Sequence, residues 1–312
     1  MAALPLLQTL VAVAVSLTTL SVNGFAIFSI VASEALRADM TARLMLSLAI
    51  SDLGSGLFVS GLSAVALLRF DVVTATPSSS SSTAVMSDAI ALFQSCAAIF
   101  FANSSVWHLA IVSVVKCVTI ANPLNYHRLL TGGRVAAAAA GIWTLNFVYA
   151  TFPLYVDAGV TFQTVTGLSG FPHATPALVG ILIVAFLLPS AVITASNARI
   201  FAIVRQHQRT IAPSAAASTS GGLDQVSWNA DVGWFLRSVR SARNIFVICI
   251  VYWSTFVPTI VTFSWRTRPT WFWFVANWIF VCHSIFNSLL YIVLHKTVRR
   301  QIRKVFGDLF HK

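Results

Sequence analysis

The chain has 312 residues, of which 57% are hydrophobic and only 9% are charged, and its formal net charge at pH 7 is +11. Soluble globular domains contain about 25% charged residues, so this composition excludes a soluble domain and predicts a chain that lies mostly within lipid. The sequence contains no Ser/His/Asp order, metal-ligand spacing or phosphate-binding loop, so we do not expect an enzyme.

Seven apolar stretches follow one another along the chain. Each is long enough to cross a bilayer as a helix, which takes roughly 17–25 residues. Backbone groups in lipid must be hydrogen-bonded within the protein, and the stretches lack the alternation of barrel strands, so we expect helices. The predicted fold is therefore an all-α membrane protein whose residues 1–294 form one bundle of seven transmembrane helices. The expected spans are 4–32, 42–68, 90–115, 135–156, 177–198, 245–263 and 271–294.

The last segment, residues 295–312, alternates basic and apolar residues. This pattern predicts a short amphipathic helix that lies on the membrane surface with a basic face toward anionic lipid. Its apolar positions are Val298, Ile302, Val305, Phe306 and Leu309, and its basic positions include Arg299, Arg300, Arg303 and Lys304.

The loop charges predict the orientation of the chain. Of twenty Lys and Arg residues, only Arg69, Arg266 and Arg268 fall in loops on one side of the expected membrane. By the positive-inside rule the other side is cytoplasmic, which places the amino terminus outside and the basic carboxyl terminus inside. The net charge therefore favours contact with an anionic inner leaflet over nucleic-acid binding. No cleavable signal peptide is expected, since the first apolar run is too long and has no basic flank.

Polar residues and prolines inside the spans form an ordered set of landmarks. A charge at the centre of a membrane helix costs roughly 2.5–3.5 kcal/mol on insertion scales, so Asp52 in span two is expected to have partners and a role. Residues 48–52 read Leu-Ala-Ile-Ser-Asp, residues 120–126 read Ile-Ala-Asn-Pro-Leu-Asn-Tyr, and residues 287–291 read Asn-Ser-Leu-Leu-Tyr. The single-residue landmarks are Asn23 in span one, Trp143 in span four, Pro189 in span five and Pro258 in span six.

In this order, and over nearly the whole chain, the landmarks resemble the rhodopsin-like (class A) family of G-protein-coupled receptors. Residues 295–312 then match that family's short eighth helix. The resemblance implies a receptor at the plasma membrane that transmits the binding of a small-molecule ligand to a heterotrimeric G protein. Two alternatives remain open: a receptor-shaped decoy or assembly partner that does not couple, and a seven-helix transporter or channel.

In the family, the span-two Asp belongs to a buried polar cluster that can bind sodium. The matching residues here are Asp52, Ser105, Ser284 and Asn287. The alternative is a structural hydrogen-bond network in which Asp52 is protonated or bridged by water. A polar switch network is expected to surround this cluster, formed by Asn23, His283 and Tyr291.

His283 stands where the family often has a second Asn. A protonated imidazole there would compete with a cation, whereas a neutral, hydrogen-bonded histidine would be a core residue. His108 in span three is expected to be a packing residue.

The outer half of the bundle predicts a largely apolar ligand pocket. Ala98 stands where amine receptors of this family place an Asp, which argues against biogenic amines, and Val281 stands where opsins place their retinal lysine. Phe256 takes the place of the family's toggle aromatic, two residues before Pro258, although plain aromatic packing is an equal alternative. A small neutral or lipophilic ligand is expected, and no retinal. The expected ligand-binding residues are Ala98, Ile99, Ala102, Phe256, Thr259, Ile260, Phe263, Trp273 and Asn277.

The inner end departs from the family pattern. Val115-Lys116-Cys117 replaces the Asp-Arg-Tyr triplet, so Lys116 keeps the positive charge but loses the planar arginine fork. The neighbouring acid, which pairs with the arginine at rest, is absent. Elevated basal activity and poor coupling both follow from these changes, and the sequence does not choose between them. The residues expected to face the G protein are Lys116, Asn125, Arg240 and Arg243.

The family's disulfide anchor at the top of span three also differs, since Ala91 occupies its position. No stapling disulfide is expected in the outer loop between spans four and five, because none of the four cysteines lies there.

Overall fold

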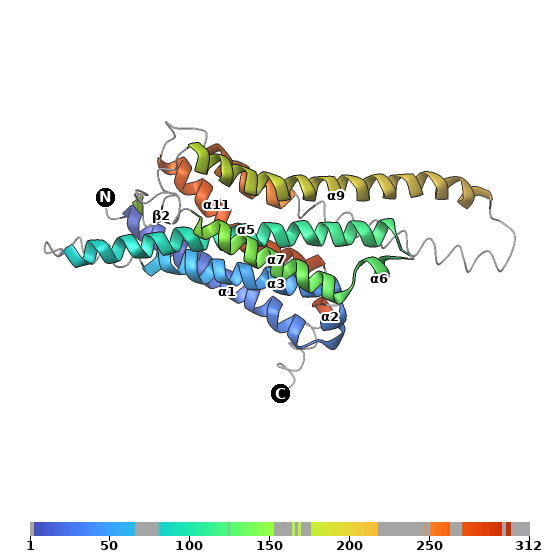
Figure 1. Ribbon diagram of the computed structural model, residues 1–312, viewed down its shortest axis with the longest axis horizontal. Coiled ribbons are helices and arrows are strands. Elements are labelled where there is room, and N and C mark those ends of the chain that lie inside the picture. Colours follow the sequence, from blue (N-terminus) through green and yellow to red (C-terminus); the bar gives the residue numbers. More distant parts are fainter. Residues whose placement is uncertain are drawn as a thin grey trace.

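The computed structural model places long helices side by side in one bundle (Figure 1). In chain order the elements are α1 (Ala3–Val31), α2 (Glu34–Ala38), α3 (Met40–Ser55), η1 (Gly56–Gly61), α5 (Ser81–Ala121), α6 (Tyr126–Leu129), α7 (Gly132–Thr151), α9 (Pro176–Ala217) and α11 (Thr270–Leu294). Residues 250–262 form a further helical segment between α9 and α11. The structure describes residues 3–65, 81–123, 125–152, 164–165, 168–169, 176–217, 247, 250–262, 270–294 and 298–300.

A described helix overlaps each of the seven predicted spans, in the same order along the chain. Among the described residues, five helices are long and apolar enough to cross a membrane, and Ile250–Thr262 is a shorter apolar helix. α5 extends beyond the predicted span 90–115 at both ends, and α9 extends beyond 177–198 at its carboxyl end. Hydropathy marks only the part of a helix that lies in hydrocarbon, and a helix can continue past it with polar residues. Of the predicted tail helix 295–312, residues 298–300 are helical and the remainder lies outside the described residues.

The second span contains a π-helical turn, η1, directly after α3. Glycines on each side of its start let two neighbouring helices approach closely. A Cβ atom on Gly54 would lie 2.2 Å from the Phe101 ring of α5, and one on Gly56 would lie 2.8 Å from the Thr19 methyl group of α1. Ser16 of α1 also donates a hydrogen bond to the Gly56 carbonyl at 2.9 Å. A larger residue at either position would push the helices apart.

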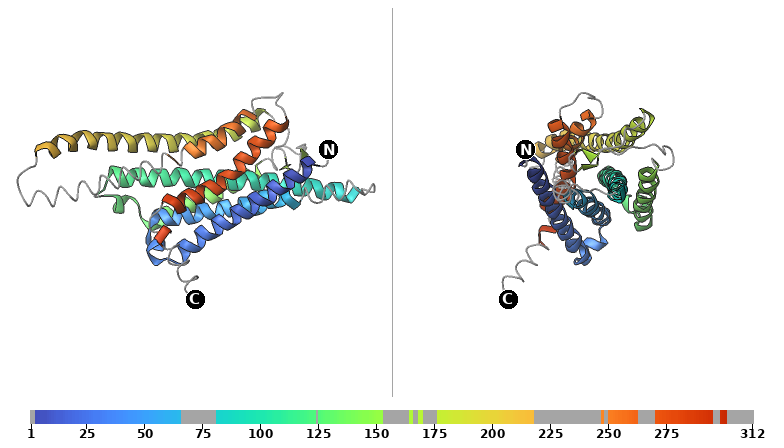
Figure 2. Two further views of the ribbon diagram at one scale, coloured as in Figure 1. Left: turned by 180° about the vertical axis from the view of Figure 1, so that it is seen from behind. Right: turned by 90° about the vertical axis from the view of Figure 1, so that its left-hand side faces the viewer.

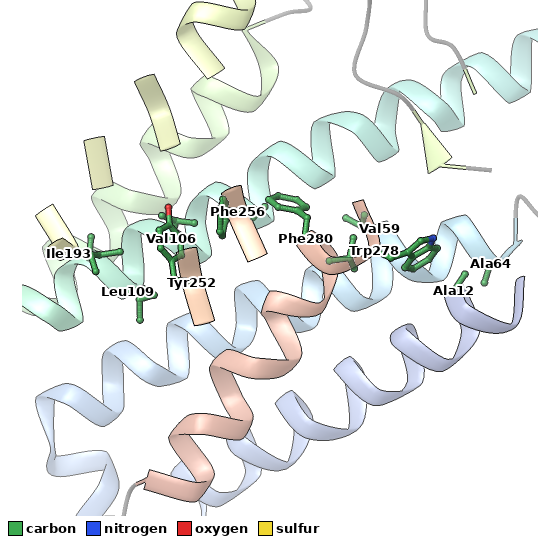
Figure 3. Packing of buried hydrophobic residues seen from close by; sticks show 13 residues of the cluster. Ala12, Val59, Ala64, Val106, Leu109, Ile193, Tyr252, Phe256, Trp278 and Phe280 are labelled. Atoms are coloured by element: carbon green, nitrogen blue, oxygen red, sulfur yellow. The ribbon is translucent and has the colours of Figure 1, made fainter. Parts of the chain in front are cut away.

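Two apolar clusters hold the helices together. The larger one is rich in aromatic side chains and joins α1, η1, α5, α9, the segment 250–262 and α11 (Figure 3). The second contains Ile30, Leu44, Val115 and Tyr291 and packs the ends of α1, α3, α5 and α11. Seen along the bundle, α7 and α9 are separate helices that both lie beside α5 (Figure 2), against which each of them packs.

One feature departs from the all-α prediction. Thr164–Val165 (β1) pairs with Leu168–Ser169 (β2) in an antiparallel ladder, with Thr164 opposite Ser169 and Val165 opposite Leu168. This two-residue ladder lies in the connection between α7 and α9. Three cysteines in the described part of the chain, Cys96, Cys117 and Cys282, are free thiols.

Candidate functional site

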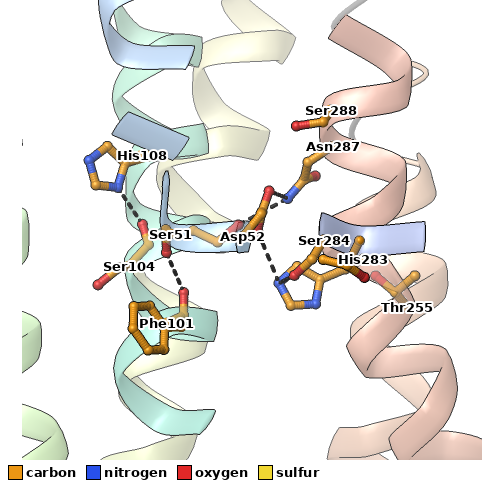
Figure 4. Close-up of polar contacts among 12 residues, drawn as sticks. Ser51, Asp52, Phe101, Ser104, His108, Thr255, His283, Ser284, Asn287 and Ser288 are labelled. Atoms are coloured by element: carbon orange, nitrogen blue, oxygen red, sulfur yellow. Dashed lines mark hydrogen bonds and ion pairs between the residues drawn. The ribbon is translucent and has the colours of Figure 1, made fainter. Parts of the chain in front are cut away.

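Asp52 lies on α3 one turn before the π-helical turn, and it is completely buried. The Asn287 side-chain amide of α11 donates to Asp52 Oδ2 at 3.2 Å and to Ser105 Oγ of α5 at 2.9 Å (Figure 4). One amide therefore joins three helices around the carboxylate. The structure thus brings Asp52, Ser105 and Asn287 together, as the sequence predicts.

Asn23 extends this arrangement to α1. Its amide nitrogen donates to the Thr19 carbonyl at 2.9 Å and to the Ser284 carbonyl at 3.1 Å. Its oxygen accepts a hydrogen bond from Ser288 Oγ at 2.5 Å. Ser288, which replaces the family's proline, was not among the predicted site residues. A serine keeps α11 unbroken through this turn and adds a bond to α1, whereas a proline would remove a helix hydrogen bond.

His283 occupies the other side of the carboxylate. Its Nδ1 bonds the Phe280 carbonyl, and since a carbonyl only accepts, Nδ1 carries the hydrogen. In the neutral ring Nε2 is then an acceptor, and it faces Asp52 Oδ1 at 3.9 Å. Oδ1 has no hydrogen-bond partner in the described part of the chain. Nε2 accepts a long hydrogen bond from Ser284 Oγ at 3.5 Å, so Oδ1 is the acceptor left open, and a proton, a water molecule or a small cation beside it would satisfy it.

The donor set around Oδ1 has the chemistry that a small hard cation prefers. The orphan carboxylate oxygen and the hydroxyl groups of Ser105 and Ser284 are hard oxygen ligands. Asn287, in contrast, turns its N–H group toward the carboxylate, so its oxygen does not contribute there. Among the described residues, no group of three or more His, Cys, Asp or Glu side chains gathers as a transition metal would require. The residues that would hold sodium are therefore Asp52, Ser105 and Ser284.

Aromatic rings connect this polar hub with the outer half of the bundle. We use "polar hub" for Asp52, Asn23, Ser105, His283, Ser284, Asn287 and Ser288. The Phe256 ring lies 5.5 Å from the His283 ring and 5.1 Å from the Phe280 ring, measured between centroids. Tyr252, one turn along the same helical segment, hydrogen-bonds Ser190 of α9 at 2.5 Å. Phe256 therefore contacts the hub directly.

The predicted ligand-binding residues separate into groups. Ala98, Ala102 and Phe256 belong to the large aromatic cluster, on the side of α5 that faces the segment 250–262. Ile99 instead packs against Ala150 of α7, in a separate cluster. Thr259 donates to the Ala276 carbonyl of α11 at 3.3 Å, so its hydroxyl group ties two helices together. Ile260 and Asn277 are half-buried, whereas Phe263 and the side chain of Trp273 lie outside the described residues.

The inner end shows a charge partner that sequence reasoning missed. Lys116 is half-buried, and the Asp39 carboxylate acts on it electrostatically. Asp39 precedes α3 and caps its amino terminus by accepting from Thr41 N at 2.8 Å. The sequence prediction considered only the neighbouring position, where Val115 replaces the acid of the family. Asn125 is exposed just before α6, and the remaining predicted contacts, Arg240 and Arg243, lie outside the described residues.

A second buried polar group lies on the opposite side of α3. His108 Nδ1 donates to the Ser104 carbonyl at 2.7 Å, so its Nε2 accepts from Ser47 Oγ, also at 2.7 Å. Trp143 Nε1 of α7 in turn donates to Ser47 Oγ at 2.9 Å. His108 was expected to be a packing residue, and it is a buried, fully hydrogen-bonded one that joins α3, α5 and α7.

Comparison with known proteins decides the family. A family model described as "7 transmembrane receptor (rhodopsin family)" matches residues 22–291. The chain belongs to the rhodopsin family of seven-transmembrane receptors. The predicted fold class, a seven-helix membrane bundle, is thereby confirmed, and this receptor is a multi-pass membrane protein.

Relatives of this rhodopsin-family receptor include proteins named trace amine-associated receptors. It is 24% identical over 231 residues to trace amine-associated receptor 4 of Rattus norvegicus, a match that covers 69% of this chain and 65% of the relative. It is 23% identical over 229 residues to trace amine-associated receptor 7d of Mus musculus, with 68% of this chain and 61% of the relative covered. The matched region thus spans less than two thirds of the length of these relatives.

Proposed function

We propose that the protein is a cell-surface receptor that transmits the binding of a small neutral or lipophilic ligand to intracellular heterotrimeric G proteins. The amino terminus would lie outside and the basic carboxyl terminus inside. The observation that carries this proposal is the contact sequence from Phe256 to His283 and from His283 to Asp52. It provides a direct physical connection between the expected pocket and the charge at the centre of the bundle.

The mechanism would be a shift between two conformations of the bundle. A ligand can move such an equilibrium only by binding one conformation more tightly than the other. A ligand that contacts Phe256 would displace its ring relative to His283 and thereby change the environment of Asp52. Pro258 and Pro189 interrupt the hydrogen bonding of their helices, which makes the segment 250–262 and α9 the elements most able to bend.

The ligand is proposed to be neutral, although the relatives above carry "trace amine" in their names. An ammonium ion bound away from water is best stabilised by a carboxylate. Ala98 and Ala102 do not offer one, and none of the residues of the large cluster around them carries a carboxylate. Within the spans, the carboxylate that the structure describes is that of Asp52. It contacts His283 and Asn287. A lipophilic ligand that packs against aromatic rings suits this pocket.

We also propose that Asp52, Ser105 and Ser284 hold a sodium ion. When bound, it would supply positive charge that offsets the buried Asp52 carboxylate. The cation would stabilise the conformation in which α3, α5 and α11 converge on Asp52, and a ligand-driven separation of these helices would release it.

G-protein activation in cells tests the proposal. Activation across G-protein families would be measured without ligand for the wild type and for Lys116→Arg, with surface expression measured in parallel. Restoring the arginine fork is expected to raise coupling severalfold, because a guanidinium makes more directed hydrogen bonds than an ammonium group. Lys116→Gln, which removes the charge, serves as the matched control and is expected to lower it.

Silence of all three proteins, at normal surface expression and with a panel of neutral lipophilic compounds, would contradict coupling. That result would favour the receptor-shaped partner that does not signal. Val115→Asp would restore the missing acid, but it is less suitable as a test of coupling. Val115 is buried beside Tyr291, so the new carboxylate would be desolvated and the fold destabilised.

A further inference from the structure

We propose that this receptor carries a second binding site, for a neutral lipophilic alcohol or phenol, in a groove between α5, α7 and α9. The groove has a volume of about 440 Å³, which falls in the range of pockets that hold drug-sized molecules. Its lining includes Asn103 and Trp107 of α5, Asn146 and Tyr149 of α7, and Gly180 and Val184 of α9. None of these is a residue of the polar hub or of the pocket near Phe256.

The groove exists because α7 and α9 pack against α5 and have little contact with each other. Gly180 keeps it open on the α9 side, since a Cβ atom there would meet nothing within 4 Å. The lining side chains Leu145 and Val184 are exposed at the surface of the bundle, at 56% and 60%. In a membrane this surface faces lipid, so a ligand would enter from the bilayer and not through the aqueous mouth of the bundle.

The polar atoms of the groove specify what it can bind. The Asn146 amide nitrogen donates to the Ile142 carbonyl at 2.8 Å, which fixes the orientation of that side chain. Its oxygen therefore faces Asn103 and accepts from Asn103 Nδ2 at 2.6 Å. Asn103 Oδ1 is consequently an acceptor, and it is buried without a hydrogen-bond partner in the described part of the chain.

The hydroxyl group of Tyr149 is also buried without a hydrogen-bond partner among the described residues. Lipid contains no water that could hydrogen-bond these groups, so each unsatisfied group carries a free-energy cost. Both residues line the groove, and after a small side-chain rotation a ligand hydroxyl group there could donate to Asn103 Oδ1 or accept from Tyr149.

The rest of the lining selects against charge. None of the lining residues is charged near neutral pH, and most of them are aliphatic or aromatic. A charged ligand would be desolvated without a counter-ion. An acyl chain of a lipid would fill the space but offers no hydrogen-bond donor. A compact molecule with one hydroxyl group and an apolar body fits both the space and the acceptors.

Photolabelling of the purified receptor in lipid nanodiscs tests this site. The probe is a diazirine derivative of 2,6-diisopropylphenol, with labelled peptides identified by mass spectrometry. Labelling is expected on α5 and α7 near Asn103 and Tyr149, and unlabelled 2,6-diisopropylphenol is expected to compete. Its methyl ether, which has the same shape but no donor, is expected to compete about tenfold less well. Equal competition by the ether would overturn the proposed hydrogen bond.

Two variants and a control separate specific binding from general contact with lipid. Gly180→Leu is expected to fill the groove and abolish labelling there. Tyr149→Phe is expected to weaken competition by the phenol severalfold without affecting the fold, because it removes a hydroxyl group that bonds nothing in the described structure. Gly141→Leu is the matched control, since Gly141 lies on α7 outside the groove lining and a Cβ atom there also meets nothing within 4 Å.

Unchanged labelling in Gly180→Leu, or an equal loss in Gly141→Leu, would overturn the site. Unchanged competition in Tyr149→Phe would contradict the role given to its hydroxyl group. Because the readout is binding, the result does not depend on whether the receptor couples to G proteins.

Discussion

Two buried polar groups flank α3, and they differ in whether their hydrogen bonds are complete. In the group formed by Ser47, His108 and Trp143, the hydrogen bonds run from donor to acceptor without a gap. In the polar hub, Asp52 Oδ1 has no hydrogen-bond partner in the described part of the chain, and the His283 Nε2 atom that faces it at 3.9 Å accepts only a long bond of 3.5 Å from Ser284 Oγ. Both groups contain a histidine bonded through Nδ1 to a carbonyl of its own helix, Ser104 for His108 (Figure 4) and Phe280 for His283.

The difference teaches where a switch can reside. A complete network inside lipid stabilises one arrangement, and any movement leaves a buried group unsatisfied. An incomplete network can be completed in more than one way, by a proton, a water molecule or a cation, and each way favours its own arrangement of the helices. The His108 group therefore serves stability, and the polar hub is the part of the receptor that a ligand can influence.

The largest expected effect comes from breaking the complete network. Ser47→Ala would leave both Trp143 Nε1 and His108 Nε2 without a partner, and we expect the free energy of unfolding to fall by about 2–4 kcal/mol. Thermal unfolding in detergent would show this as a lowered midpoint. Ser113→Ala is the control, because Ser113 bonds only the Leu109 carbonyl of its own helix. Equal midpoints for the two variants would refute the structural role of the group.

A smaller loss is expected where α11 meets α1. Ser288→Ala removes the donor to Asn23 Oδ1, leaves that oxygen buried, and should lower the free energy of unfolding by about 1–2 kcal/mol. The same unfolding assay measures it. Ser29→Ala on α1, whose hydroxyl group bonds the Phe25 carbonyl one turn earlier, is expected to cost much less. If both variants unfold alike, the bond between α1 and α11 contributes nothing.

Sodium should distinguish the two networks directly. At five times its dissociation constant, a ligand that binds only the folded state adds about 1 kcal/mol to stability. The wild type is therefore expected to unfold at a higher temperature in sodium chloride than in choline chloride of equal ionic strength. Asp52→Asn should abolish this difference, and Ser47→Ala should retain it. If sodium does not change the unfolding temperature of the wild type, the proposed sodium site in the polar hub is contradicted.

The smallest effect is expected at the inner end. Asp39→Asn keeps an oxygen that can cap α3 but removes the charge that acts on Lys116. Partly exposed charge pairs contribute roughly 0.2–1 kcal/mol, so basal G-protein activation should rise by a factor of about two. Asp39→Glu is the control that keeps the charge. A fall in basal activation would show that this pair supports the active conformation instead.

The sequence predicted the helices well, because apolar length is a direct consequence of the thickness of the bilayer. The meeting of Asp52 with Asn287 came from the resemblance to a family, since no local pattern relates two residues that far apart in the chain. The spacing of Ser284, Asn287 and Tyr291 places them on one face of α11, because residues three and four apart are neighbours on a helix.

Other features depend on packing that no local pattern reports. Ile99 and Ala98 are adjacent in sequence but belong to different clusters, because neighbouring helical positions point about 100° apart. Asp39 was missed because its role depends on how the start of α3 packs near α5. Ser288 was seen only as a lost proline, since its donor role appears only when α1 is placed beside α11.

The π-helical turn at Gly56–Gly61 has a consequence for comparing this receptor with its relatives. A π turn accommodates one residue more than an α turn, which rotates everything beyond it by roughly one residue, or about 100°. Counting from Asp52 along a regular helix therefore assigns residues 62–65 to the wrong face. A relative without this turn would present a different side chain at the same depth. An alignment of the outer half of this helix with such a relative thus needs a one-residue gap.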